Sequence, residues 1–428
     1  MFASPRRLDL KLYCTPQRSA NSKALEIWPE LPIVIVVEDV KSKEGVANVI
    51  GALRQHNRVC KLYYRKGQFL DSSRFLKEFA AINEPFPALI TLCLFPSQQQ
   101  NIPVLPASFL GGSAPRLRLF HLEGIPYPSI GKLLSSTTNL VRLSLWDIPH
   151  SGYIAPETIV PCLSPLSRLE SLDLGFRYQD NINIRANRHP PPFTRVVLPN
   201  LTSFRFCGGN EYLEDVLSRI ETPVLHEGVF SFFNDQLVFD TPLLGHFIRR
   251  TEGFMTSHAA HIECFDSSIW IRLSGRKEMA DDDSQGLWMG VSCDPLEMQL
   301  SALSLAQVLT SVSSSLSNLE SLDIAVDRED WQCEIEVIQW RELLRLFTTV
   351  KKVTLDSNSV RLVVPALREP SGERATEVLL PALQNLCLDM DLEDWRPSRI
   401  DNEAIEQFIA ARQIHGHPVT VHYSDMVK

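Results

Sequence analysis

Residues 137–149 have the sequence Thr137-Thr138-Asn139-Leu140-Val141-Arg142-Leu143-Ser144-Leu145-Trp146-Asp147-Ile148-Pro149. Within this segment, Leu140 to Leu145 follows the pattern L-x-x-L-x-L. Side chains alternate across a β-strand, so Leu143 and Leu145 face one side while Arg142, Ser144 and Trp146 face the other. The pattern therefore predicts a strand with one buried face and one polar face.

The same frame recurs along the chain, and this recurrence carries more weight than any single copy. Clear copies are Leu89/Leu92/Leu94, Leu117/Phe120/Leu122, Leu169/Leu172/Leu174, Leu201/Phe204/Phe206, Leu319/Leu322/Ile324, Val350/Val353/Leu355 and Leu383/Leu386/Leu388, and Val59/Leu62/Tyr64 is a weaker one. A strand frame of this kind, repeated at intervals, is the signature of a leucine-rich repeat.

Each repeat has room for a helix, because successive frames begin between 23 residues apart (Leu117 to Leu140) and 33 residues apart (Val350 to Leu383). Apolar spacing predicts helices at Lys43–Gln55, Ser129–Ser136, Pro156–Leu166, Glu211–Ile220, Pro242–Arg250, Leu303–Leu316, Gln339–Phe347 and Asn402–Ile414. We therefore predict an α/β fold, a leucine-rich-repeat solenoid with a curved parallel sheet on its concave side and helices outside. Residues 31–400 form the solenoid, 1–30 an N-terminal flank, and 401–428 a C-terminal cap with a last strand at His417–Tyr423.

The pattern is less regular in the middle of the chain. Leu225–Phe233, Ala260–Cys264 and Trp288–Cys293 indicate strands that lack the full leucine frame. The asparagine usual after the repeat strand is also missing, since Ile125 and Ile148 occupy its place, so other groups must satisfy the backbone there. Pro-rich or charged segments predict insertion loops at 177–197, 275–286 and 369–376.

Composition narrows the classes of partner and compartment. The 428 residues include 42 Lys and Arg against 51 Asp and Glu, a net charge of −9, and an acidic chain is not expected to bind nucleic acid. The nine cysteines lie far apart without a C-x-x-C pair, which indicates reduced thiols in a cytoplasmic or nuclear protein. The longest apolar run, Ile33 to Val37, is too short to span a membrane, and residues 1–14 lack the apolar core of a signal peptide.

Candidate chemical sites have simpler explanations. Asp281–Asp283 are adjacent in a predicted loop and without a ligand pattern around them, which favours a solvated loop over a cation site. His258 and His261 differ in strand parity, so they would not share a metal with Glu263 and Cys264. The predicted loop with Arg177, Arg185, Arg188 and Arg195 is basic, but the net negative charge of the whole chain disfavours nucleic-acid binding there. We find no nucleotide-binding or hydrolase motif, and expect no enzyme activity, cofactor or metal.

The remaining candidate is the polar face of the repeat strands. Alternation places on it His121, Glu123, Arg142, Ser144, Trp146, Asp173, Arg205, Asp323, Lys352, Thr354, Asp356, Asn385 and Asp389. Mixed polar residues with an exposed tryptophan are typical of protein-binding surfaces, where Trp and Arg contribute most per residue. The alternative for each residue is an ordinary solvated strand face.

Seven segments spread over nearly the whole chain are distinctive when taken together: Phe2–Leu8, Trp28–Pro32, Phe109–Pro115, Ile148–Ile154, Glu211–Asp215, Phe239–Pro242 and Phe408–Arg412. In these segments the chain resembles the leucine-rich-repeat region of F-box-like proteins from mushroom-forming fungi. In that family the F-box binds the Skp adaptor of a cullin ubiquitin ligase, and the repeats are thought to select the substrate. The resemblance therefore implies a substrate-recognition module with an unidentified protein partner.

One departure from the family affects this expectation. The segment Phe2–Leu8 resembles the residues that lie directly after the F-box in the family, which implies that the F-box is missing here and that this chain does not bind the Skp adaptor. Two functions of different class stay open: substrate recognition related to a ubiquitin ligase, and a stand-alone repeat scaffold or sensor without a ligase link.

Overall fold

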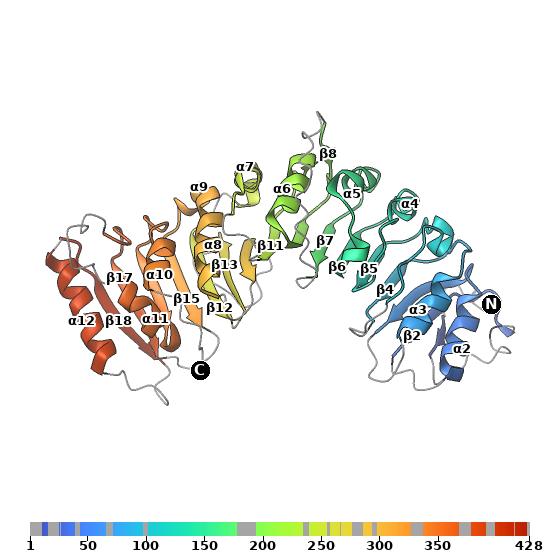
Figure 1. Ribbon diagram of the computed structural model, residues 1–428, viewed down its shortest axis with the longest axis horizontal. Helices are drawn as coiled ribbons and strands as arrows, with labels where there is room; N and C mark the ends of the chain where they lie inside the picture. Colours follow the sequence, from blue (N-terminus) through green and yellow to red (C-terminus); the bar gives the residue numbers. More distant parts are fainter. Residues whose placement is uncertain are drawn as a thin grey trace, which may run out of the picture. The chain divides into compact units, whose positions relative to one another are not determined.

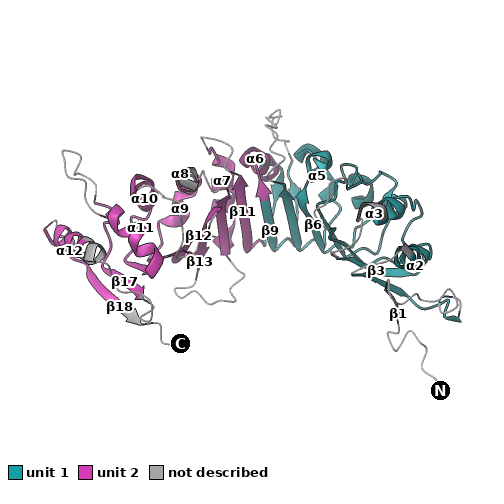
Figure 2. Ribbon diagram, turned by 60° about the horizontal axis from the view of Figure 1, so that its bottom comes forward, with its two compact units in different colours: residues 1–206, 218–224 teal, residues 207–217, 225–428 magenta. Residues whose placement is uncertain are grey.

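The fold comes from a computed structural model, which describes residues 11–15, 25, 27–38, 43–65, 72–96, 102–177, 194–233, 239–254, 257–265, 267–275, 286–292, 298–326, 337–367, 378–390, 399–414 and 416–425 (Figure 1). The chain divides into two compact units. Unit 1 contains Met1–Phe206 and Ser218–Val224, and unit 2 contains Cys207–Leu217 and Leu225–Lys428 (Figure 2).

Unit 1 is built on strands that lie in the sheet in chain order. They are β1 (Leu12–Cys14), β2 (Ile33–Val37), β3 (Val59–Tyr64), β4 (Thr91–Leu94), β5 (Leu119–Glu123), β6 (Arg142–Ile148), β7 (Ser171–Phe176) and β9 (Ser203–Gly208). Neighbours from β1 to β7 pair in parallel. A separate short parallel pair joins β8 (Val196–Val197) and β10 (Ile220–Glu221).

Helices connect the strands of unit 1 and pack on the leucine side. They are α2 (Lys43–Leu53), α3 (Ser72–Ala80), α4 (Gly131–Leu134) and α5 (Pro156–Leu163), with 3-10 turns η2 (Phe109–Gly112) and η3 (His150–Gly152). The strand leucines Leu143 and Leu172 are fully buried. Aromatic side chains fill the space nearer the N-terminus, where the rings of Phe79 and Phe109 meet edge to face at 5.1 Å. Burial of these apolar side chains is the main stabilising contribution to unit 1.

Two asparagines, each directly before a leucine frame, supply part of the backbone hydrogen bonding that the asparagine after a regular repeat strand would give. The side-chain amide of Asn139 donates to the Pro115 carbonyl at 3.1 Å, and that of Asn200 donates to the Ser167 carbonyl at 2.6 Å. Each bond links one repeat to the turn of the repeat before it. The carbonyls of these turns are thereby satisfied from the next repeat.

A left-handed residue comes after each of the two strand segments that precede an Ile-Pro pair. Gly124 has φ 64° and Asp147 has φ 51°, and β6 has a register irregularity against β7 after Leu145. The next residues, Ile125 and Ile148, are buried. The left-handed turn thus brings the isoleucine into the core where a regular repeat would carry its asparagine.

Unit 2 combines parallel repeat strands with an antiparallel insertion. The sheet order is β11 (Glu227–Phe233), β14 (Gly286–Ser292), β13 (Ser268–Ser274), β12 (Ala259–Phe265), β15 (Ser321–Val326), β16 (Lys352–Asp356), β17 (Asn385–Met390) and β18 (Thr420–Asp425). Strand β13 pairs antiparallel with both β12 and β14, whereas the other pairs are parallel. Only a short turn separates Phe265 from Ser268, and so short a connection allows only an antiparallel hairpin.

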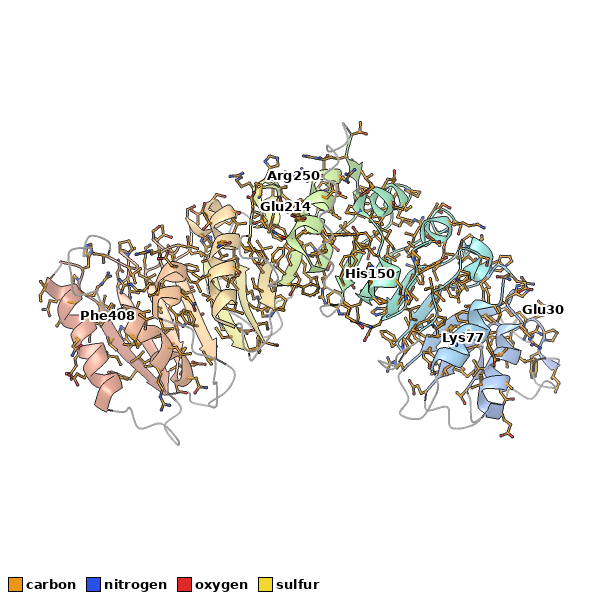
Figure 3. All side chains as sticks on the ribbon, in the orientation of Figure 1. Glu30, Lys77, His150, Glu214, Arg250 and Phe408 are labelled. Atoms are coloured by element: carbon orange, nitrogen blue, oxygen red, sulfur yellow. The ribbon has the colours of Figure 1, made fainter. Side chains whose placement is uncertain are left out.

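The helices of unit 2 are α6 (Asn210–Arg219), α7 (Pro242–Arg250), α8 (Met298–Ser311), α9 (Ser313–Leu316), α10 (Val337–Leu344), α11 (Ser357–Leu367) and α12 (Arg399–Ile414). Helix α7 begins without a side-chain cap from Thr241. The Glu214 carboxylate of α6 replaces that cap, accepting bonds from the backbone N–H groups of Leu243 and Leu244 at 2.9 and 2.7 Å (Figure 3). A carboxylate at a helix N-terminus satisfies free N–H groups and favours the helix dipole.

The last helix is fixed to the repeat before it by one buried arginine. Arg412 of α12 donates to the carbonyls of Leu379, Leu380 and Leu383 at 3.1, 3.1 and 3.2 Å. The guanidinium also lies 6.0 Å from the ring of Phe408, which Figure 3 labels. These bonds hold α12 over the turn that leads into β17.

Most predicted elements are present in the structure. Every recurring leucine frame forms a strand, and the predicted helices are found with their ends shifted by a few residues, except that Leu303–Leu316 is divided between α8 and α9. The elements that were missed include strand β13, helix α11 and the short strands β8 and β10. Part of the loop predicted at 177–197 is strand β8, while 178–193, 276–285 and 369–376 lie outside the described residues.

Candidate functional site

The strands of each unit have a face opposite the core, which we call the open face. In unit 1, one cross-strand row on this face contains Cys93, His121, Ser144 and Asp173, which are register partners on β4, β5, β6 and β7. The next row begins with Glu123 opposite Trp146. Strand pairing thus brings together five of the residues that alternation predicted for the polar face.

Trp146 is a large exposed aromatic residue of this face. It is 36% exposed, and its ring lies against Gly175 of β7. A Cβ built on Gly175 would be only 2.6 Å from Cε3 of the ring and 2.8 Å from Cδ2. The indole therefore needs a glycine beneath it. One ring face is covered by β7, and its accessible surface is directed outward.

An ion pair lies beside the indole at the end of the strands. The Arg177 guanidinium donates to both carboxylate oxygens of Asp147, from Nε at 3.1 Å and from Nη2 at 2.7 Å. Gly124 lies under this pair, because a Cβ there would be 3.3 Å from Arg177 Nη2. A bidentate pair of this type fixes the geometry of both side chains.

His121 is a neutral, largely buried group of the open face. Its ring packs on Phe95 with centroids 4.3 Å apart, and burial lowers its pKa to about 4. Nε2 lies 4.0 Å from the Glu123 carboxylate, within the range of an ion pair. At neutral pH the imidazole carries no charge, so this approach is a contact of a neutral ring, and the distance is too long for a hydrogen bond.

The other predicted residues of unit 1 differ in accessibility. Arg142 and Arg205 are exposed and able to contact a partner. Asp173 is half-buried, whereas Ser144 is buried. Strand parity places Ser144 on the expected face, but the neighbouring side chains cover it, so its hydroxyl is not part of the accessible surface.

Unit 2 has an open face of its own with more internal pairing. His261, Asp323, Thr354 and Cys387 form one row across β12, β15, β16 and β17. The Glu263 carboxylate lies 3.0 Å from His261 Nε2, and this hydrogen bond, more than the nearby charges of His261 and Arg272, lowers the pKa of Glu263.

The antiparallel insertion adds two tryptophans to this face. The Arg272 guanidinium lies 4.8 Å from the ring centroid of Trp288. Trp270 lies on Gly290, where a Cβ would come within 2.4 Å of the ring, and its indole N–H donates to Ser268 Oγ at 3.1 Å. Neither tryptophan was predicted as a site residue. The strand of Trp288 was predicted and that of Trp270 was not, although the alternation Ile269-x-Ile271-x-Leu273 could have indicated it.

Two other predicted site residues of unit 2 have bonds within the chain. The Asp356 carboxylate accepts from the backbone N–H of Val326 at 2.9 Å and from that of Ser359 at 2.7 Å, so it caps α11 and fixes the end of β15. Asn385 Oδ1 lies 3.1 Å from His422 Nε2. Lys352 is exposed and Asp389 is half-buried.

Other kinds of site find no support in the described ranges. Within these ranges, His, Cys, Asp and Glu side chains form no group of three able to hold a metal ion. None of the described helices combines the length and apolar character of a membrane span. Asp281–Asp283, the other candidate cation site, lie outside the described residues.

Comparison with known proteins gives little further information. No protein family matches the sequence, and no curated protein is similar to it. Among solved structures, the leucine-rich repeat-containing protein LegL7 from Legionella pneumophila matches with a TM-score of 0.30 and 14% sequence identity, over 81% of this chain and 97% of that one. Function therefore has to be argued from the chain's own residues.

Proposed function

We propose that this chain is a non-catalytic, protein-binding module of the leucine-rich-repeat type, whose partner binds the open face of unit 1. The observation that carries the proposal is the indole of Trp146, which is held against Gly175 and remains 36% exposed. A rigid aromatic side chain contributes contact area at low entropic cost, because its orientation is fixed before binding.

The surroundings of Trp146 fit a binding surface. Arg142 on the same strand and Arg205 on β9 are exposed, and Glu123 lies directly opposite Trp146. Buried aromatic and arginine side chains at the centre of an interface supply most of its binding energy, and a polar rim excludes water around them. The polar groups of this face fit that rim.

A pair of double variants tests the proposal. Trp146→Ala with Arg142→Ala removes the two expected anchors, and the partner enriched on the immobilised protein should bind about 30-fold or more weakly, as expected for loss of about 2 kcal/mol. The control is Glu157→Ala with Thr158→Ala, two exposed residues of α5 on the helix side. Equal affinity of the open-face variant and the control would remove the open face from the interaction.

Three narrower statements belong to the same proposal. A role in substrate recognition for a ubiquitin ligase is supported by the sequence resemblance alone. If the chain has this role, the partner should be ubiquitylated less when this protein is absent. An unchanged level of ubiquitylation favours the stand-alone scaffold.

We also propose one curved solenoid, to be tested by small-angle scattering. For location we propose the cytoplasm or nucleus, because none of the described cysteines forms a disulfide.

A further inference from the structure

Three neighbouring strands of unit 1 form a small arrangement around Trp146. Strand β5 contributes His121 and Glu123, two residues apart and on the same face. Strand β6 contributes Trp146, in register with Glu123, and β7 contributes Gly175, on which the indole lies. An indole with a glycine on one side and a carboxylate on the other is thereby presented on the open face.

The same arrangement recurs in unit 2 on strands of different connectivity. Strand β12 contributes His261 and Glu263, β13 contributes Trp270 in register with Glu263, and β14 contributes Gly290, on which the Trp270 ring lies. The two copies match in four residue types: a histidine, a glutamate two positions later, a tryptophan opposite the glutamate, and a glycine beneath the indole. The recurrence provides an internal comparison of how such a surface is used.

In unit 2 an arginine of the chain itself lies beside this surface. Arg272, the register partner of His261, places its guanidinium 4.8 Å from the ring centroid of Trp288, and its positive charge acts on Glu263. Glu263 also has its hydrogen bond with His261, and the Trp270 N–H is bonded to Ser268. An arginine that lies on a tryptophan ring and near a carboxylate is thus part of the protein's own structure, and the ring is that of Trp288, the neighbour of Trp270 across the hairpin strands.

In unit 1 the residue at the position of Arg272 is not a cation, and the nearby Arg177 guanidinium donates to both carboxylate oxygens of Asp147. The register partner of His121 is Ser144, where unit 2 has Arg272, and the next position is Asp173, where unit 2 has Trp288. Glu123 is half exposed and has no hydrogen bond from the described part of the chain. His121 is neutral at physiological pH and does not compensate its charge.

We propose that the Trp146–Glu123 site of unit 1 binds the guanidinium group of an arginine side chain on the partner protein. This inference rests on the proposed function and adds the chemistry that the partner must present. The free face of the indole attracts a cation, and Glu123, on a neighbouring strand whose backbone lies about 5 Å away, has a carboxylate that accepts guanidinium N–H groups. The net charge of −9 also favours a basic partner segment.

The test uses a phage-displayed library of random dodecapeptides panned against the full chain. The selected peptides should contain an arginine whose replacement by citrulline, which is neutral and of similar shape, weakens binding at least 10-fold. Glu123→Gln should weaken the arginine peptide to a similar extent and have little effect on the citrulline peptide, because the two changes remove the same interaction. Glu157→Gln on α5, which removes the same charge from the helix side, is the matched control and should leave both affinities unchanged.

Different results overturn different statements. Selected peptides that tolerate citrulline, that depend on lysine or an acidic residue, or that bind Glu123→Gln as well as the parent protein overturn the arginine site. If Trp146→Ala with Arg142→Ala still abolishes their binding, the proposed protein-binding face stands without it. A library that yields no binder, or only binders insensitive to that double variant, overturns the arginine site and counts against the open face as well.

Discussion

Replacement of Leu143 by alanine tests which face of β6 is the core. Leu143 is fully buried, and its register partners Phe120 and Leu172 are fully buried as well, so neighbouring side chains cannot easily fill the space that it leaves. Loss of three buried carbons costs about 2.4 kcal/mol at about 0.8 kcal/mol per methylene, and the cavity raises the loss of unfolding free energy to about 3–4 kcal/mol. Urea unfolding followed by hydrogen exchange in peptides from β6 measures this loss.

Arg142→Ala is the matched control on the adjacent residue of the same strand. Arg142 is exposed on the open face, so its removal should change the unfolding free energy by less than about 0.5 kcal/mol. Similar losses for the two variants, or a loss below about 1 kcal/mol for Leu143→Ala, would mean that the two faces of β6 have been assigned wrongly. The open-face site would then lose its structural basis.

Three individual contacts give further predictions. Gly245→Ala in α7 should destabilise unit 2 by about 1–3 kcal/mol, because the new Cβ would lie 2.1 Å from the Ser311 carbonyl oxygen. Gly51→Ala in α2 is the control, because its new Cβ meets nothing within 4 Å and should stabilise unit 1 by up to about 1 kcal/mol. Thermal melts that show the same sign of change for both variants would contradict this. The pKa of His121 is lowered to about 4 in the folded protein, so as pH decreases the unfolded chain binds a proton at this residue before the folded protein does. The free energy of unfolding should therefore fall, by up to about 3 kcal/mol, between about pH 6.5 and pH 4. Urea titrations of His121→Phe should show a flatter dependence on pH over this window. Asp356→Ala removes the acceptor of two backbone N–H groups and should cost about 1–3 kcal/mol in urea unfolding, and an unchanged midpoint would show that water replaces the carboxylate.

The repeated strands could be predicted from sequence because one face of each is apolar at every second position. Burial at Leu143 and Leu172 and exposure at Arg142 result from that alternation alone. The hairpin β12–β13 was harder to predict, because it has no leucine frame and is antiparallel where the repeats are parallel. Helix α11 was missed although Val360, Val363, Val364 and Leu367 follow a helical spacing, and Pro365 inside it is no more disruptive than Pro161 in the predicted helix α5.

The candidate site was predictable as a face but not as an arrangement. Alternation identified Trp146 and Glu123, yet the contact of the indole with Gly175 depends on the pairing of β6 with β7, which no local pattern encodes. Burial of Ser144 and the capping role of Asp356 depend equally on neighbours distant in sequence. Parity gives the direction of a side chain, while its accessibility depends on the sizes of the residues across the neighbouring strands.

Site-specific photocrosslinking tests most directly the claim that the partner binds the open face of unit 1. p-Benzoylphenylalanine would replace, one at a time, Arg142 and Arg205 on the open face and Glu157 on the helix side, all of which are exposed. With the enriched partner bound, we expect crosslinks from positions 142 and 205 and none from 157. Crosslinks from position 157, with none from 142 or 205, would contradict it and place the partner on the helices.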